Sequence, residues 1–244
     1  MTNQALSGKS AFVTGGAKRI GREIALALAH AGANITITYR SSRADAKKTA
    51  KDIERLGRRA LAVECDVRSE ESVRSAIDAS VAFHKRLDVL VNNAAVFDSG
   101  KLEEISLAQW DAVFETNTRG PFLVARTAFP HLKSARGRII NIGSLGGLRA
   151  WSGHAHYCAS KAALHMLTQA MAKAFAPEIT VNCVAPGWIE MEGDKRDVAE
   201  RFAQKTPLKR NGTAREVADA VLLFAAGPAF VTGQVLTVDG GLGL

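Results

Sequence analysis

Short apolar runs alternate with longer amphipathic stretches along most of the chain. The run at 10–14 is followed by a glycine-containing turn and by a stretch at 22–31, where Ile24 and Leu28 share one helical face. Strands that alternate with helices predict a parallel sheet covered by helices on both faces. The predicted strands are 10–14, 34–39, 60–65, 87–91, 138–142, 179–184 and 235–238, and the predicted helices are 22–31, 45–56, 69–85, 106–117, 121–133 and 155–175.

The length and the regular alternation of these elements predict one α/β domain, residues 1–244, built on a doubly wound sheet of seven parallel strands. We find no internal repeat, low-complexity tract or linker that would divide it. No apolar run reaches the ~18 residues needed to cross a bilayer, and the N-terminus lacks the pattern of a signal peptide, so we expect no membrane partner. The three cysteines have the spacing of neither a disulfide framework nor a metal site, which fits a cytoplasmic protein.

Residues suited to binding or chemistry follow six of the predicted strands. In a sheet of this type, ligands bind beyond the carboxyl ends of the strands, near the point where the strand order reverses. Six such positions at one edge of the sheet favour a common site over six separate chance motifs. These residues are Thr14 and Gly15, Arg40, Asp66, Asn92 and Asn93, Ser144, and Pro186 and Gly187.

The turn at 14–21 and the end of the second strand together indicate a dinucleotide. Glycines in the turn let the backbone approach a pyrophosphate, which then lies at the N-terminus of the following helix. The second strand ends in Arg40, Ser41 and Ser42. An acidic residue at this place binds the ribose hydroxyl of NAD, whereas a basic one accommodates the 2′-phosphate of NADP, so Arg40 favours NADP(H).

The distribution of charge also favours a phosphorylated ligand. The net charge is +8, and residues 18–59 hold eleven Lys or Arg against four Asp or Glu, while residues 60–244 are balanced. A localised basic region attracts phosphates. Because the chain has no nucleic-acid motif and no interleaved aromatic pattern, we expect a phosphorylated small molecule rather than a nucleic acid.

Tyr157 and Lys161 are four residues apart in a strongly helix-forming stretch, so they share one helix face. An ammonium beside a phenol favours the phenolate, so Lys161 is expected to lower the pKa of Tyr157 and make it an acid/base group. Ser144 follows the strand at 138–142 and can reach the same site. A Tyr-x-x-x-Lys pair also occurs by chance on surface helices, so the rest of the chain decides this interpretation.

Together these motifs resemble those of the short-chain dehydrogenase/reductase family, from about Gly8 to Gly241. The resemblance implies a Rossmann fold and hydride transfer that involves NADP(H). The matching motifs are Thr14-Gly15-x-x-x-Arg19-Ile20-Gly21, Cys65-Asp66-Val67, Asn92-Asn93-Ala94-Ala95, Asn117, Ser144, Tyr157-x-x-x-Lys161, Pro186-Gly187, and Val231-Thr232-Gly233 with Val238-Asp239-Gly240-Gly241.

The resemblance implies four catalytic residues. Tyr157 would exchange a proton with the substrate oxygen, and Ser144 would hold that oxygen. Lys161 would bind the nicotinamide ribose, and the backbone around Asn117 would hold a water against Lys161. Trp151 and Trp188 would wall the substrate site beneath a lid at about 188–207.

The resemblance also implies where the cofactor lies. Asp66 would hold the adenine amino group, Val67 would give a backbone contact, and Asn92 and Ala94 would line the adenosine ribose. The expected cofactor contacts are Gly15, Lys18, Arg19, Ile20, Gly21, Arg40, Ser41, Ser42, Asp66, Val67, Asn93, Ala94, Ala95, Tyr157, Lys161, Pro186, Gly187 and Ile189.

Three positions depart from the family pattern. Arg19 stands where a glycine is usual, as in members that resemble pteridine reductases, where such an Arg helps to hold the 2′-phosphate. Ala95 replaces a glycine and narrows the cleft. Met191 replaces a common threonine and affects one contact to the carboxamide or phosphate of the cofactor.

The resulting hypothesis is NADPH-dependent reduction of a ketone to a secondary alcohol. In its length, in Ser144 and in its C-terminal end, the chain most resembles 3-oxoacyl-[acyl-carrier-protein] reductases, so a 3-oxoacyl thioester and an acyl carrier protein are the expected partners. The turn with Lys18 and Arg19 leaves a pteridine reductase as an alternative. A catalytically idle NADP-binding sensor is a third possibility, although it would be expected to lose Tyr157 or Lys161.

Two further expectations concern metals and assembly. His154 and His156 flank Tyr157, but no acid or cysteine supports a metal there, so no metal is expected. The helices at 121–133 and 155–175 carry many small or apolar residues. By resemblance to the family, two-fold pairing of these helices would build a homotetramer.

Overall fold

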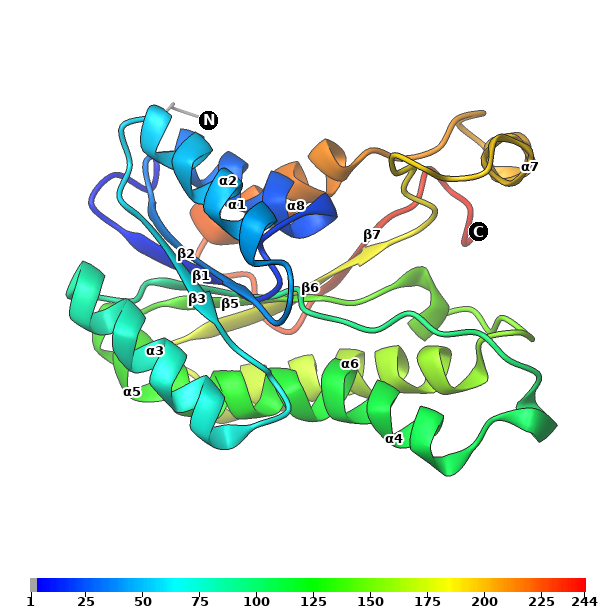
Figure 1. Ribbon diagram of the computed structural model, residues 1–244, viewed down its shortest axis with the longest axis horizontal. Coiled ribbons are helices and arrows are strands. Elements are labelled where there is room, and N and C mark those ends of the chain that lie inside the picture. Colours follow the sequence, from blue (N-terminus) through cyan, green and yellow to red (C-terminus); the bar gives the residue numbers. More distant parts are fainter. Residues whose placement is uncertain (1–3) are drawn as a thin grey trace.

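A computed structural model describes residues 4–244 and contains one sheet of seven parallel strands in the order β3-β2-β1-β4-β5-β6-β7 (Figure 1). The order reverses between β1 and β4, which pair with each other after the chain has run outward from β1 to β3. The predicted fold class is confirmed. The strands are β1 (Ser10–Val13), β2 (Asn34–Tyr39), β3 (Ala60–Glu64), β4 (Val89–Asn92), β5 (Arg138–Ile142), β6 (Thr180–Pro186) and β7 (Val235–Val238).

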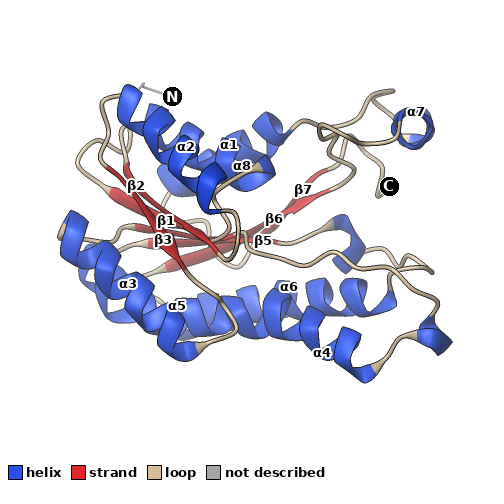
Figure 2. Ribbon diagram, in the orientation of Figure 1, coloured by secondary structure: helices blue, strands red, loops and turns tan. Residues whose placement is uncertain are grey.

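Helices cover both faces of this sheet (Figure 2). In the view of Figure 1, α1, α2 and α8 lie above the sheet and α3, α4, α5 and α6 lie below it, while α7 stands apart at one end. The helices are α1 (Arg19–His30), α2 (Arg43–Arg55), α3 (Glu70–His84), α4 (Leu107–Phe114), α5 (Gly120–Ala135), α6 (Ala155–Ala174), α7 (Arg196–Lys205) and α8 (Ala214–Ala226).

Strand β1 shows why the apolar runs are continuous rather than alternating. All four of its residues are buried. Ala11 and Val13 belong to the core beneath α1 and α8, whereas Phe12 points into the core on the side of α3 and α5. Successive side chains of a strand point to opposite faces, so a strand with helices on both sides needs apolar residues throughout.

Several helix boundaries follow capping residues rather than the hydrophobic pattern. Helix α3 begins after Ser69, whose Oγ accepts the Ser72 N–H at 3.2 Å. Helix α8 begins after Thr213, which forms a capping box with Glu216. Helix α1 starts at Arg19, three residues before the predicted start, and β6 continues two residues beyond its predicted end.

The predicted helices 106–117 and 121–133 form one continuous helical stretch. Between α4 and α5 lies a π-helical turn, Glu115–Arg119, in which the Gly120 N–H donates to the Glu115 carbonyl. This wider turn accommodates one residue more than an α-helical turn does. The sequence interpretation left residues 118–120 between the two helices, whereas the structure continues the helix through them.

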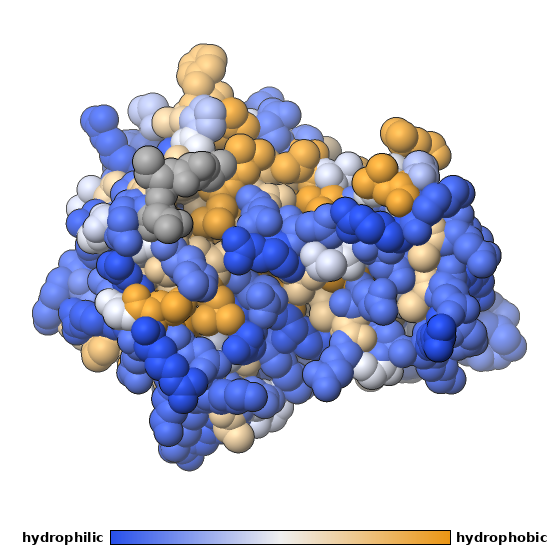
Figure 3. All heavy atoms as spheres, turned by 90° about the horizontal axis from the view of Figure 1, so that it is seen from above, coloured by the Kyte–Doolittle hydropathy of each residue, from blue (hydrophilic) through white to orange (hydrophobic). Residues whose placement is uncertain are grey.

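Hydrophilic residues cover most of the face seen from above Figure 1, which includes α1 and α2 (Figure 3). Lys47, Lys48 and Lys51 are exposed on α2 and carry part of the basic excess of residues 18–59. Within residues 4–244, none of the helices combines the length and the apolar character required to cross a bilayer.

Candidate active site

The turn after β1 brings the backbone of residues 15–21 close against the start of α1. Gly15 has a φ of +63°, a conformation that favours glycine. A Cβ on Gly21 would overlap the Gly15 carbonyl oxygen. Lys18 precedes α1 without a side-chain cap, and the first turn of α1 has no acidic residue. The N–H groups of Arg19, Ile20 and Gly21 at this helix start therefore suit an anion such as a pyrophosphate.

Thr14 ties this turn to the end of β4. Its Oγ1 accepts the N–H groups of Asn93 and Ala94 at 2.9 and 3.0 Å. The Asn93 amide donates in return to the carbonyls of Thr14 and Gly15, at 2.9 and 3.1 Å. These bonds join the two strands between which the sheet order reverses, where ligands bind in such folds. The Asn93 side chain is thus used to hold the turn after β1, and Ala95, two residues later, is exposed.

Basic side chains surround the same end of the sheet. Lys18 is exposed and lies 3.9 Å from Asp45. Arg19 is also exposed and has a φ of +55°, which explains in physical terms why glycine is the usual residue there. Arg40 and Ser41 are exposed after β2, and Ser42 precedes α2 without capping it. Arg19, Arg40 and Ser41 are therefore exposed to a ligand, whereas Lys18 is already paired with Asp45.

Asp66 is already paired within the chain. Its carboxylate accepts from the Arg68 guanidinium, at 2.6 Å for the shortest contact. This hydrogen bond chiefly, and also the charge of the nearby Arg40, lowers the pKa of Asp66. A bound adenine would have to share the carboxylate with Arg68. Val67 is buried, and Gly120 of α5 approaches it so closely that a Cβ would lie 2.9 Å from its Cγ2.

At the other half of this edge, Tyr157 and Lys161 lie one turn apart on α6, as predicted, and Ser144 follows β5. Lys161 is buried, and its Nζ donates to the Ile142 carbonyl at 2.8 Å and lies 5.9 Å from the centre of the Tyr157 ring. Burial lowers the pKa of Lys161 to about 8. Ser144 Oγ accepts the Gly146 N–H at 3.0 Å.

The prediction that Lys161 lowers the pKa of Tyr157 is wrong for the protein without ligand. Burial raises the pKa of Tyr157, and the nearby Ser144 side chain offsets only part of this increase. The Lys161 ammonium is directed to the Ile142 carbonyl instead. Tyr157 therefore stays protonated at neutral pH, the form that can donate a proton.

Asn117 lies in the π-helical turn and is fully buried. Its side chain accepts the Val96 N–H at 2.8 Å and donates to the Val96 carbonyl at 2.9 Å and to Ser160 Oγ at 3.1 Å. The amide thus joins the loop after β4 to α6 at Ser160, which is three residues after Tyr157 and one before Lys161. A water between its backbone and Lys161 stays a prediction.

Aromatic rings surround Tyr157. Phe97, which is 60% exposed, meets the Tyr157 ring edge-on with the centres 4.8 Å apart. Trp151 lies nearly parallel to Tyr157 at 6.2 Å, and His154 stacks on Phe97 at 4.6 Å. Trp151 is where the sequence predicts a substrate wall, and Phe97 adds a second, exposed ring. Within residues 4–244, no three His, Cys, Asp or Glu side chains gather as metal ligands would.

Beyond β6, the chain passes from Pro186 to the predicted lid. The Gly187 N–H donates to the Val238 carbonyl at 2.9 Å, and Ile189 is buried. The Trp188 ring stacks on Phe202 of α7, with the centres 4.1 Å apart and the planes 5° from parallel. One face of the Trp188 ring therefore packs against α7 and is not available to a substrate.

A hollow opens between the turn after β1 and the start of this lid. Lys18, Arg19, Thr49 and Met191 are among the residues that line it. Met191 therefore faces the cleft in which the basic residues lie, and its departure from the common threonine affects this cleft directly.

The sequence interpretation missed His165, which lies on α6 one turn after Lys161 and is buried against Ser144. The spacing of four from Lys161 was visible in the sequence. The short segment at 143–147 that covers this residue could not be placed without the fold.

Comparison with known proteins supports this picture. The family model described as enoyl-(acyl carrier protein) reductase matches residues 15–243. A 3-oxoacyl-[acyl-carrier-protein] reductase of Synechocystis is 37% identical over 242 residues, which cover 98% of both chains.

Solved structures agree with the sequence relatives. A short-chain dehydrogenase from Burkholderia cenocepacia, in complex with NADP, superimposes with a TM-score of 0.93 at 37% identity, covering 99% of this chain and 100% of the other. A blue fluorescent protein from a metagenomic library, in complex with NADPH, gives a TM-score of 0.90 at 37% identity and covers 98% and 99% of the two chains. With its fold, its turn after β1 and its Ser144, Tyr157 and Lys161, the chain belongs to the short-chain dehydrogenase/reductase family of oxidoreductases.

Proposed function

We propose that this protein reduces a ketone to a secondary alcohol with NADPH, and that the ketone is a 3-oxoacyl thioester. The observation that carries the proposal is that Ser144, a protonated Tyr157 and the buried Lys161 come together at the carboxyl edge of the sheet. A hydroxyl that can hold a carbonyl oxygen stands beside a phenol that can protonate it. This pair matches what ketone reduction requires.

The residues at the other half of the edge fit a phosphorylated dinucleotide. The uncapped start of α1 offers free N–H groups, and Gly15 leaves room where a Cβ would lie 3.1 Å from the Ala94 Cα. Arg19 and Arg40 supply positive charge for a 2′-phosphate. NADP(H), which related structures contain, supplies a hydride to the carbonyl carbon when it is bound.

In the proposed mechanism, Ser144 Oγ binds the substrate oxygen and Tyr157 gives its proton to that oxygen. The raised pKa of Tyr157 keeps the proton in place until the oxygen gains negative charge. Lys161, with a pKa of about 8, then stabilises the tyrosinate and helps to return the proton. Asn117 fixes the helical turn whose backbone would hold a water against Lys161.

The substrate class rests on the relatives and on charge. The Synechocystis relative acts on an acyl-carrier-protein substrate by its name. The basic excess of residues 18–59 would draw acidic acyl carriers and phosphopantetheine thioesters, so their association should slow as salt rises.

A pteridine reductase is the second candidate, and a specific observation favours it. Phe97 and Trp151 present aromatic rings beside Tyr157. Flat heterocycles such as dihydropterin or dihydrofolate stack well on such rings. The exposed ring of Phe97 is the one available to a ligand.

One experiment separates these functions. Oxidation of NADPH is followed with a 3-oxoacyl thioester and with dihydropterin, each at two salt concentrations. The proposal expects the thioester to be reduced with the higher kcat/KM, falling with salt. Faster pterin turnover would establish the second candidate, and no turnover of either substrate would leave only a ketoreductase of unspecified substrate.

The role of Tyr157 is tested separately by Tyr157→Phe, which keeps the ring and removes the proton donor. NADPH binding should survive while turnover falls by on the order of 10²-fold or more, the scale of general acid catalysis. Near-normal turnover in this variant would falsify the role of Tyr157.

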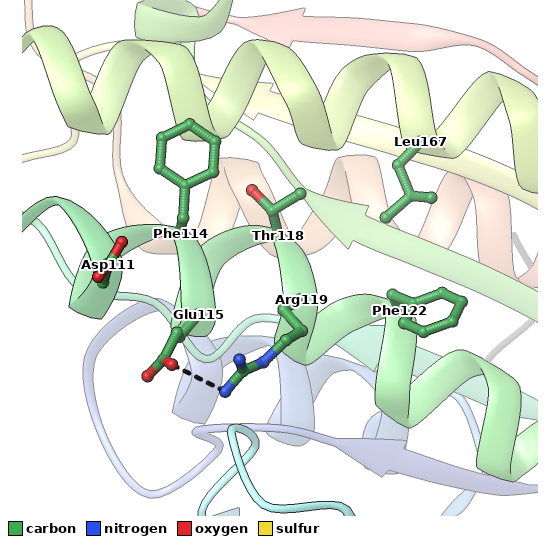
Figure 4. A pocket seen from close by; sticks show the side chains of 7 residues that line it. All are labelled: Asp111, Phe114, Glu115, Thr118, Arg119, Phe122 and Leu167. Carbon is green, nitrogen blue, oxygen red and sulfur yellow. Dashed lines mark ion pairs between the residues drawn. The ribbon is translucent and has the colours of Figure 1, made fainter.

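We also propose that the protein is a homotetramer in the cytoplasm, where its three free, buried cysteines stay reduced. Apolar side chains lie open on α4, α5 and α6: Leu107, Phe122 and Met166 are 81%, 41% and 64% exposed. Figure 4 shows the hollow between these helices, with Phe114, Phe122 and Leu167 around it and the Glu115–Arg119 ion pair at its rim. Covering this face with a second copy would bury these rings. A monomer mass in light scattering at micromolar protein contradicts the assignment.

A further inference from the structure

A buried histidine lies directly beneath Ser144. His165 is on α6, one turn after Lys161 and two turns after Tyr157, and it is 6% exposed. Its Nε2 lies 3.4 Å from the Ser144 backbone nitrogen and accepts that N–H in a long hydrogen bond. None of the roles proposed above uses this side chain.

The segment around Ser144 is shaped to the imidazole ring. A Cβ on Gly143 would overlap His165 Nε2, and a Cβ on Gly147 would lie 2.6 Å from His165 Cε1. Neither glycine has a positive φ. The backbone conformation therefore does not require glycine at either position. The space is taken by the ring, together with Cys183 Sγ at Gly143 and the α6 backbone at Gly147. Two glycines and one histidine form a complementary set on both sides of Ser144.

The surroundings keep this ring neutral. Burial, and then the charge of Lys161, lowers the pKa of His165 to about 4, although the Gly147 backbone offsets part of the decrease. Cys183 of β6 borders the same space, and burial raises the pKa of its thiol to about 12, so it carries no charge either. Because Nε2 accepts the Ser144 N–H, the ring hydrogen must reside on Nδ1.

We propose that His165 is a positioning residue that holds Ser144 in place for catalysis. Its ring anchors the Ser144 peptide from below, while the Gly146 N–H binds Ser144 Oγ from the other side. Between these two contacts the Ser144 hydroxyl is held at a fixed place on the Tyr157 side of the sheet edge. Loss of such support misplaces a reacting group and lowers turnover more than binding. The inference rests on the proposed role of Ser144 in binding the substrate oxygen.

A matched pair of variants separates the hydrogen bond from simple filling of space. His165→Gln places Oε1 close to the position of Nε2 and can accept the Ser144 N–H. His165→Met has a similar length but offers only a weak acceptor. We expect His165→Met to lower kcat for the ketone by about 5- to 10-fold, the size of one hydrogen bond, with an unchanged Kd for NADPH. His165→Gln should recover most of that loss.

A double-mutant cycle shows whether the effect passes through Ser144. In the Ser144→Ala background, His165→Met should cause no further loss of kcat. Equal rates for the Gln and Met variants, or losses that multiply in the double variant, would overturn the proposal while leaving the proposed function intact. A wild type that reduces no ketone would instead count against the function itself.

The state of the ring is tested without any turnover. Nitrogen-15 NMR of histidine-labelled wild type should show His165 neutral, with the hydrogen on Nδ1 and none on Nε2, from pH 5 to 8. A hydrogen on Nε2, or a charged ring in this range, would refute the proposed contact. This measurement also decides the matter if a His165 variant fails to fold.

Discussion

The hydroxyl of Thr14 offers a sharp test of how the two halves of the site are joined. Thr14 is 1% exposed, and its Oγ1 accepts two backbone N–H groups, from Asn93 and Ala94. Thr14→Val keeps the volume of the side chain and removes the acceptor. Each donor left without a partner costs about 1–3 kcal/mol, and partial access to water lowers the cost, so we expect a loss of about 2–4 kcal/mol in the free energy of unfolding.

Thr14→Ser is the matched control, because it keeps the hydroxyl and loses one methyl group, which costs about 1 kcal/mol. The two variants and the wild type are unfolded in urea at one protein concentration, since assembly would make stability depend on concentration. The Val variant should be the less stable of the two and should bind NADPH more weakly, because the turn at Gly15 loses its tie to β4. Equal stability of the Val variant and the wild type would refute the reasoning.

Three other substitutions test separate parts of the site. Arg40→Asp should reduce the preference for NADPH over NADH, because it removes a charge-assisted phosphate contact. The preference is measured as the ratio of the kcat/KM values for the two cofactors. A wild type that uses both cofactors equally would contradict the NADP assignment. Lys161→Met should abolish turnover yet raise stability at pH 7 by about 1–2 kcal/mol, because burial disfavours the ammonium. The pKa of Lys161 is lowered from 10.5 to about 8, so the stability of the wild type should rise toward that of the variant as pH rises from about 8 to 10.5. A variant that is less stable than the wild type in thermal unfolding at pH 7 would contradict this prediction. Phe202→Ala should speed hydrogen exchange in α7 by removing the stack on Trp188, and unchanged exchange would show that the stack does not hold the lid.

The sheet could be predicted from the sequence because its signals are local and repeated. Continuous apolar runs such as Phe12 and its neighbours identify strands buried on both faces, and the glycine turn marks the first crossover. The same logic placed Tyr157 and Lys161 on one face of α6, because a spacing of four fixes their neighbourhood once the helix exists.

What the sequence could not supply depends on burial and on contacts across the chain. The raised pKa of Tyr157 comes from desolvation, which exceeds the effect expected from a neighbouring charge. The pairing of Asp66 with Arg68, only two residues away, was accessible in principle, but its geometry depends on the turn after β3. The position of His165 under Ser144 requires α6 and β5 to be packed together first.

The wide turn at Glu115–Arg119 lets this helical stretch hold one residue more than a regular α-helix would. In a regular helix, each residue added or removed rotates everything beyond it by about 100°. Because the wide turn absorbs the extra residue, deletion of one residue here would restore a regular α-helix and leave α5 and Phe122 on their present face. Asn117, which reaches Val96 from within this turn, would lose that position. A single-codon deletion would therefore disconnect Asn117 from the loop after β4 and spare the proposed assembly surface.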